Sequence, residues 1–147
     1  TVTEERMTDR EKLAIGFFRR GIGCAQAIMC AYAKELSISH EEALRMAEEY
    51  AAGTYLLCGP VMAMHVILNG LLNKGYSKTP YELTGAAKEH GARMDGALEK
   101  QFGSLACREL RAEKEEGKEL ICIRVISAIV TLLDAFLIEQ QNQDCKR

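Results

Sequence analysis

Cysteine is the residue type whose number and placement in this chain most clearly point to chemistry. The 147 residues include six cysteines, at Cys24, Cys30, Cys58, Cys107, Cys122 and Cys145. This count is below that of a disulfide-stapled scaffold, in which cysteine reaches roughly 8–10% of residues. In a reducing compartment, cysteines serve redox, catalytic or metal-binding roles more often than structural ones. The composition therefore predicts functional thiols.

Four of these cysteines fall at or just before predicted helix starts, and they are Cys24, Cys58, Cys107 and Cys122. The first-turn amides of a helix lack intrahelical partners and carry the positive end of its dipole, which favours a thiolate over a thiol. At such positions the pKa of a cysteine can fall from about 8.5 to about 3.5–7.5. A thiolate attacks disulfides and binds metals, so we predict that these four are the reactive thiols, with their pairing left open.

The remaining cysteines and the histidines have simpler interpretations. Cys30 falls in the middle of a predicted helix and is interpreted as core packing, while Cys145 lies in the polar tail. His65 follows Cys58 by seven residues on nearly the same helical face, so it is a candidate proton acceptor or metal ligand. A hydrogen-bonded core histidine is the more common finding at such a position, and the same holds for His90.

The elements that must position these side chains are helices. Capping boxes, in which Ser or Thr precedes Glu by three residues, mark helix starts at Thr8, Ser39 and Thr79, and Pro60 suits the first turn after Cys58. We expect helices over residues 8–21, 24–36, 39–53, 60–73, 79–103, a short one from 104, and 120–141. No β alternation interrupts them. The sequence therefore predicts an all-α fold, a compact single-domain bundle of six or seven helices over residues 1–147 with a polar tail at 142–147.

Composition and charge exclude some classes of function. Hydrophobic residues make up 48% and charged residues 27% of the chain, which is typical of a folded protein. The formal net charge of −2 offers no basic surface for nucleic acid. The longest apolar run, near residues 120–133, is shorter than the roughly 20 residues of a membrane span and contains Arg124. The N-terminus shows no signal-peptide pattern, so no membrane span and a cytoplasmic location are expected.

Four landmarks surround the four cysteines. They are Gly21-Ile22-Gly23-Cys24-Ala25-Gln26-Ala27, Cys58-Gly59-Pro60-Val61-Met62-Ala63, Phe102-Gly103-Ser104-Leu105-Ala106-Cys107-Arg108-Glu109-Leu110, and Cys122. In this pattern the chain resembles the small all-helical family of redox-active proteins with the C_GCAxxG_C_C cysteine signature, over about residues 17–137. Two departures occur, because Pro60 and Ala63 stand where the family has Ala and Gly. The resemblance implies a redox role for the four cysteines and no particular substrate.

Three hypotheses for the function follow. The first is a thiol-based redox protein whose cysteines cycle between thiol and disulfide, with partners from different helices because no Cys-x-x-Cys dithiol is present. The second is a zinc or iron–sulfur site held by Cys24, Cys58, Cys107 and Cys122, with His65 as a further candidate ligand. The third is a helical interaction module with inert cysteines. Enzymatic activity, the redox partner or small-molecule substrate, and homo-oligomerisation are left open.

Overall fold

The computed structural model describes residues 7–48, 58–73, 82–106 and 118–145, and the structural statements below refer to this part of the chain. It contains six helices and no strand in these ranges. Their bounds are α1 Asp9–Arg19, α2 Cys24–Ala31, α3 His40–Ala47, α4 Gly59–Asn73, α5 Ala87–Phe102 and α7 Lys118–Cys145. The predicted all-α fold is therefore confirmed for the described residues.

Local capping chemistry defines several helix ends as predicted. The Thr8 hydroxyl accepts a hydrogen bond from the Glu11 amide at 3.2 Å, and the Glu11 carboxylate accepts one from the Thr8 amide at 3.5 Å. Ser39 accepts a hydrogen bond from the Glu42 amide at 3.1 Å and begins α3. Gly103 ends α5 with a φ of 83°, which a residue with a side chain rarely adopts. The predicted cap at Thr79 lies outside the described residues.

The predicted extent of α2 is wrong at its C-terminal end. We expected this helix to reach Leu36, but it ends at Ala31 and is followed by turns. The Ala31 carbonyl accepts a hydrogen bond from the guanidinium of Arg10 on α1, which takes the place of a further helical turn. Ser37, with a φ of 58°, then redirects the chain toward α3. A contact with another helix therefore decides where α2 ends.

The predicted start of α5 is also wrong. Helix periodicity suggested a start near Thr79, yet α5 begins only at Ala87. The preceding loop is held by two asparagines of α4. The Asn69 side chain donates to the Glu82 carbonyl at 2.8 Å, and the Asn73 side chain donates to the Thr84 carbonyl at 3.0 Å. These bonds compete with helix formation because they engage the backbone of residues 82–84.

Leu83 shows why a glycine is needed inside α5. This residue matched the apolar periodicity of the predicted helix, but it lies before α5 and covers Gly91. A Cβ atom added at Gly91 would lie 2.4 Å from the Leu83 methyl groups. The glycine that weakens the helix intrinsically thus permits close packing of the loop against it.

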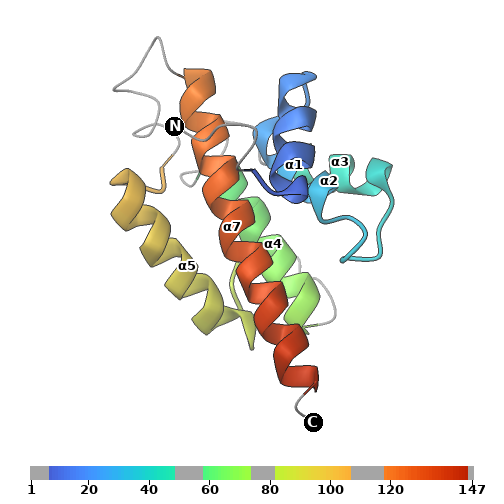
Figure 1. The fold of residues 1–147 in the computed structure, drawn as a ribbon, viewed down its shortest axis with the longest axis vertical. Coiled ribbons are helices and arrows are strands. Elements are labelled where there is room, and N and C mark those ends of the chain that lie inside the picture. Colours follow the sequence, from blue (N-terminus) through green and yellow to red (C-terminus); the bar gives the residue numbers. More distant parts are fainter. Residues whose placement is uncertain (1–6, 49–57, 74–81, 107–117, 146–147) are drawn as a thin grey trace.

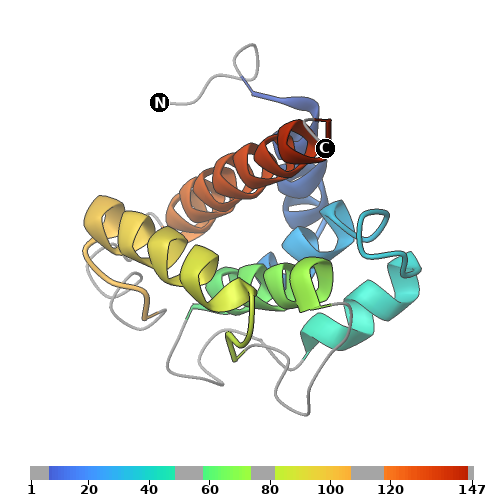
Figure 2. The ribbon, with the colours of Figure 1, turned by 90° about the horizontal axis from the view of Figure 1, so that it is seen from below.

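Helix α4 lies at the centre of the fold. Every residue of α4 from Gly59 to Asn69 is buried, and the helix contacts α2, α5 and α7. In Figure 1, α4 and α7 run side by side, with α5 on one flank and α1 to α3 on the other. The end-on view of Figure 2 shows the same four groups surrounding the core. This arrangement brings the starts of α2, α4 and α7 toward one region.

Helix α7 is longer than the predicted helix, which covered residues 120–141. Its segment Ile121–Asn142 contains an 18-residue window with a mean hydropathy of 2.3 and is long and apolar enough to cross a membrane, by length and composition only. The inner face, including Ile126, Ile129 and Leu133, is fully buried by the other helices. Core helices pass the same test, so the expected absence of a membrane span stays a prediction.

Candidate functional site

Cys24 occupies the first position of α2, as predicted. Gly23 precedes it as the N-cap residue, and the Gly23 carbonyl accepts the Ala27 amide at 2.8 Å. The Cys24 side chain is partly exposed and packs against the core cluster. The start of the helix therefore presents this thiol at the boundary between core and solvent.

Cys122 lies beside Cys24 although the two are far apart in sequence. A side-chain hydrogen bond with Cys122 is the largest cause of the raised pKa of Cys24, so α2 and α7 meet at these two thiols. Cys122 is also partly exposed. We expected it in the first turn of the last helix, but α7 extends back to Lys118, so Cys122 is at least one turn inside it. The predicted amide contact with a helix start does not apply to this cysteine.

The electrostatics of Cys24 differ from the prediction. The hydrogen bond with Cys122, burial, and the charges that Cys122 and Cys58 would carry all raise the pKa of Cys24 well above its ordinary value. The Ala25 amide, part of the helix start, acts in the opposite direction but is the smallest of the causes. The raised pKa favours the protonated thiol at Cys24, where we had expected a thiolate.

Cys58 is a third cysteine whose charge would affect Cys24. It directly precedes α4 and acts electrostatically on Cys24, yet its side chain is only 6% exposed. Its amide donates to the Leu105 carbonyl at 2.6 Å, and its carbonyl accepts the Met62 amide at 3.1 Å. Both backbone groups of Cys58 are thus hydrogen-bonded, which holds this buried residue in place at the start of α4.

The structure describes the side chain of one further cysteine, Cys30, and not those of Cys107 and Cys145. Cys30 is 7% exposed, belongs to the core, and lies 4.0 Å from the His40 carbonyl, which confirms the core interpretation. Burial raises the pKa of Cys30 to about 11. Cys107 and the short helix expected around it lie outside the described residues. Cys145 ends α7, but its side chain is not among those described.

His65 is a core histidine with a carboxylate partner. It is 4% exposed, and its Nε2 atom lies 2.7 and 2.9 Å from the two carboxylate oxygens of Asp95 on α5. This contact joins α4 to α5 and engages one of the two ring nitrogens, Nε2. His90 packs edge-on against Phe136, with ring centroids 5.0 Å apart. The structure thus favours packing and pairing roles for both histidines.

Gln26 is a residue of the site that sequence reasoning missed. Its side-chain oxygen accepts the amide of Gly23 at 3.2 Å, and its nitrogen donates to the Leu44 carbonyl at 3.0 Å. These two bonds attach the start of α2 to α3 and so hold Cys24 in position. The signal was present in the Gly23-Cys24-Ala25-Gln26 landmark, because a Gln three residues after an N-cap can bond back to its amide.

The described side chains provide no support for the predicted four-cysteine metal site. Within residues whose placement is described, no three His, Cys, Asp or Glu side chains form a group that could hold a metal ion. Cys107 lies outside the described residues. The four-cysteine zinc or iron–sulfur site therefore stays a prediction.

The described residues form helices only, and two thiols from separate helices, Cys24 and Cys122, meet between them. These features are those of a helical protein with paired thiols. A scan of protein-family models then matches residues 22–136 to the family described as "Putative redox-active protein (C_GCAxxG_C_C)". The match covers most of the chain, so the protein belongs to this family, as the four cysteine landmarks suggested. No curated protein and no solved structure gives a significant match.

Proposed function

We propose that the protein is a thiol–disulfide redox protein whose reactive pair is Cys24 and Cys122. The observation that carries this proposal is the hydrogen bond between these two thiols, which come from separate helices. Two thiols that interact side chain to side chain are candidates for a disulfide, whose formation requires a suitable separation of the two Cα atoms. Membership of a redox-active family supports the same interpretation.

The two cysteines have different roles in the proposed reaction. Cys24 keeps its proton because its pKa is raised, and its S–H stabilises negative charge on the Cys122 sulfur. The Cys122 thiolate therefore attacks a substrate disulfide, forms a mixed disulfide and releases one substrate thiol. Cys24 then loses its proton and attacks the Cys122 sulfur of that mixed disulfide, which releases the second thiol.

This sequence balances without any further reagent. Two thiols of the protein become one disulfide, and one substrate disulfide becomes two thiols, so two electrons and two protons pass to the substrate. The reverse reaction oxidises a substrate dithiol. Partial exposure of Cys24 and Cys122 lets a substrate sulfur approach, whereas the buried Cys58 is shielded from it. Reactive roles for Cys58 and Cys107 stay predictions.

A thiol count on anaerobically purified protein tests the proposal. Reduced wild type is oxidised with a graded series of glutathione disulfide, and the accessible thiols are counted before and after reductant. We expect a reversible loss of two thiols, and peptide mapping should show a Cys24–Cys122 linkage. Cys24→Ser and Cys122→Ser should each abolish this linkage.

Cys30→Ser is the matched control, because Cys30 lies on the same helix as Cys24 but is buried in the core. This variant should retain the reversible two-thiol change. The proposal fails if wild type forms no intramolecular disulfide at a physiological glutathione ratio, or if the linkage joins other cysteines. Metal analysis of the same preparation decides the zinc or iron–sulfur alternative, since stoichiometric metal released with loss of thiol protection would replace the redox proposal.

A further inference from the structure

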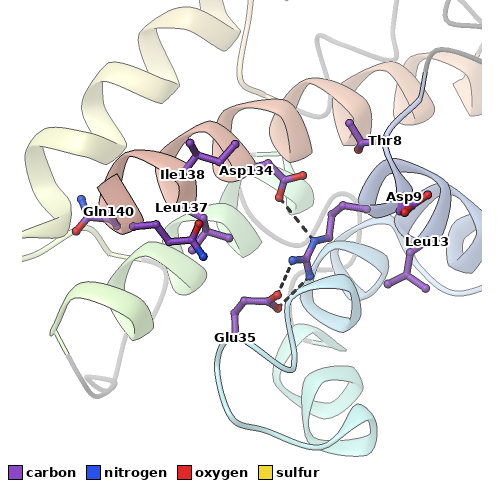
Figure 3. Close-up of a pocket in the computed structure, with 10 residues that line it drawn as sticks. Thr8, Asp9, Leu13, Glu35, Asp134, Leu137, Ile138 and Gln140 are labelled. Atoms are coloured by element: carbon purple, nitrogen blue, oxygen red, sulfur yellow. Dashed lines mark hydrogen bonds and ion pairs between the residues drawn. The ribbon is translucent and has the colours of Figure 1, made fainter. Parts of the chain in front are cut away.

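A groove lies on the molecule away from the cysteines. It has a volume of about 660 Å³ and is bounded by the first half of α1, the turn after α2 and the last part of α7. Figure 3 shows residues from these three segments facing one another around the Glu35 and Asp134 carboxylates. Cys122 and Asp134 are 12 positions apart on α7, about 18 Å along the helix, so the groove is a separate site.

Both helices of the groove present apolar side chains to solvent. Leu13 on α1 is 41% exposed and Ile138 on α7 is 58% exposed, and these are the exposed large hydrophobic residues among those described. Scattered exposed hydrophobic residues are normal, but here both line one groove. Figure 3 places them on opposite sides of the Glu35 and Asp134 carboxylates. Leu13 and Ile138 thus form an apolar border on two sides of the carboxylates.

The α7 side of the groove is one continuous helical face. Asp134, Leu137, Ile138 and Gln141 follow the spacing i, i+3, i+4, i+7, so their side chains form a single stripe. This stripe borders the buried stripe of α7, and Leu137 also packs against the core. A helix face of this kind, beside a second helix, is the geometry that accepts a third helix.

The charge of the groove is predominantly negative. Its lining contains three carboxylates, those of Asp9, Glu35 and Asp134, against one guanidinium, that of Arg10. Arg10 is already engaged, because its nitrogens lie 2.5 Å from Glu35 and 3.6 Å from Asp134. Asp134 also accepts the Tyr32 hydroxyl at 2.9 Å. An anionic ligand would have to displace these partners, whereas a cationic one would meet surplus carboxylate oxygens.

We propose that this groove docks a basic amphipathic helix of a partner protein. Its apolar residues would cover Leu13 and Ile138, and a Lys or Arg would reach the carboxylates between them. A second copy of the chain in symmetric contact would place the same acidic groups against each other, which is unfavourable.

Binding of designed peptides to the whole protein tests this inference. The probes are two fluorescently labelled helical peptides of about 18 residues with one Leu pattern, in which the remaining positions are Lys in one and Glu in the other. We expect the Lys peptide to bind at least about tenfold tighter by fluorescence anisotropy, with an affinity that falls as salt rises. Hydrogen exchange should show protection in α1 and the last part of α7.

Variants separate the groove from the general charge of the protein. Leu13→Ser with Ile138→Ser should weaken binding of the Lys peptide by about fivefold or more, because the apolar border is lost. Asp9→Asn should weaken it more than Glu99→Gln, which removes the same charge from an exposed site on α5. Far-UV circular dichroism and thermal unfolding check that each variant folds.

Three outcomes would overturn the proposal. Equal affinity for the Lys and Glu peptides would remove the charge argument. Unchanged binding by the Leu13 and Ile138 double variant would place the peptide elsewhere. Concentration-dependent dimerisation that the double variant abolishes would assign the groove to a second copy. The result is independent of the Cys24–Cys122 chemistry, since Cys24→Ser should bind the Lys peptide as wild type does.

Discussion

Helices α2 and α7 meet at two places that differ in chemical character. At the start of α2, Cys24 contacts Cys122, and at its end Tyr32 donates to the Val130 carbonyl at 3.2 Å and to Asp134 at 2.9 Å. From the first contact to the Val130 contact both chains advance eight residues, about 12 Å. The two helices therefore run in the same direction and are joined at both ends.

The difference between these ends separates the proposed reactive contact from a structural one. Tyr32 is fully buried, and the Arg10 guanidinium lies 4.5 Å from the centroid of its ring while also pairing with Glu35 and Asp134. Tyr32, Arg10 and Asp134 each have at least two partners at this end, and none of these side chains can form a disulfide. The thiol end combines partial exposure with two sulfur atoms that are able to form a bond with each other. The same helix pair thus combines a fixed end with a switchable one.

Oxidation should produce the largest effect on stability. Cys24 and Cys122 are 98 positions apart, so a disulfide between them would restrict the unfolded chain strongly. We expect oxidised wild type to unfold with a free energy about 2–4 kcal/mol higher than reduced wild type, measured by urea denaturation with and without reductant. Cys24→Ser should show no dependence on reductant. Coincident transitions for oxidised and reduced wild type would contradict the proposed linkage.

Alkylation of Cys24 should report the coupling within the thiol end. Because Cys122, burial and Cys58 raise the pKa of Cys24, its reaction with iodoacetamide in reduced wild type should accelerate only above the pH typical of ordinary cysteines. Cys122→Ala removes the largest cause, so the midpoint of the pH profile should move downward by at least about one unit. Mass spectrometry of the Cys24 peptide measures this, and an unchanged midpoint would show that burial alone governs the thiol.

Tyr32→Phe tests the fixed end. The substitution removes the hydroxyl that bonds Val130 and Asp134, while the ring and its contact with Arg10 remain. We expect a loss of about 1–2 kcal/mol in the free energy of unfolding, equal in oxidised and reduced protein. The yield of the Cys24–Cys122 disulfide should not change. A changed disulfide yield would show that the two ends of α2 are coupled.

Glu35 should give the smallest effect, visible only in acid. Burial raises the pKa of Glu35, but hydrogen bonds and charge from Arg10 outweigh it and hold the pKa below its usual value. The resulting stabilisation is complete above the unfolded pKa of about 4.3 and is lost as pH falls through the folded pKa. Because both side chains are partly exposed, Glu35→Gln should cost less than about 1 kcal/mol near neutral pH. The difference from wild type should shrink toward low pH, and a constant difference would exclude the ion pair as its cause.

Prediction from the sequence succeeded where the interactions are local. The caps at Thr8 and Ser39 and the stop at Gly103 depend on residues within one turn, so a short window contains the information needed. It failed at the end of α2, where Arg10 binds the Ala31 carbonyl, and at the start of α5, where Asn69 holds the loop. Those contacts come from other helices.

The candidate site follows the same division. The placement of Cys24 at the first position of α2 and of Cys58 just before α4 was visible in the sequence. Charged residues inside an apolar helix indicate an ion pair or an edge position, and here Asp134 lies 3.6 Å from Arg10 while Arg124 is exposed. Nothing in the sequence pattern indicated that Arg10, Glu35 and Leu13 line a groove, because each is an ordinary residue of a polar helix or turn.

The sequence by itself determined a helical chain with cysteines at several helix starts, since capping, periodicity and residue type act over a few positions. Only the tertiary structure decided which thiols meet and in which protonation state. The pairing of Cys24 with Cys122 spans most of the chain, and the raised pKa of Cys24 arises from that neighbour and from burial more than from its own helix. Local dipoles favour a thiolate, but a second sulfur within hydrogen-bond distance has the larger effect.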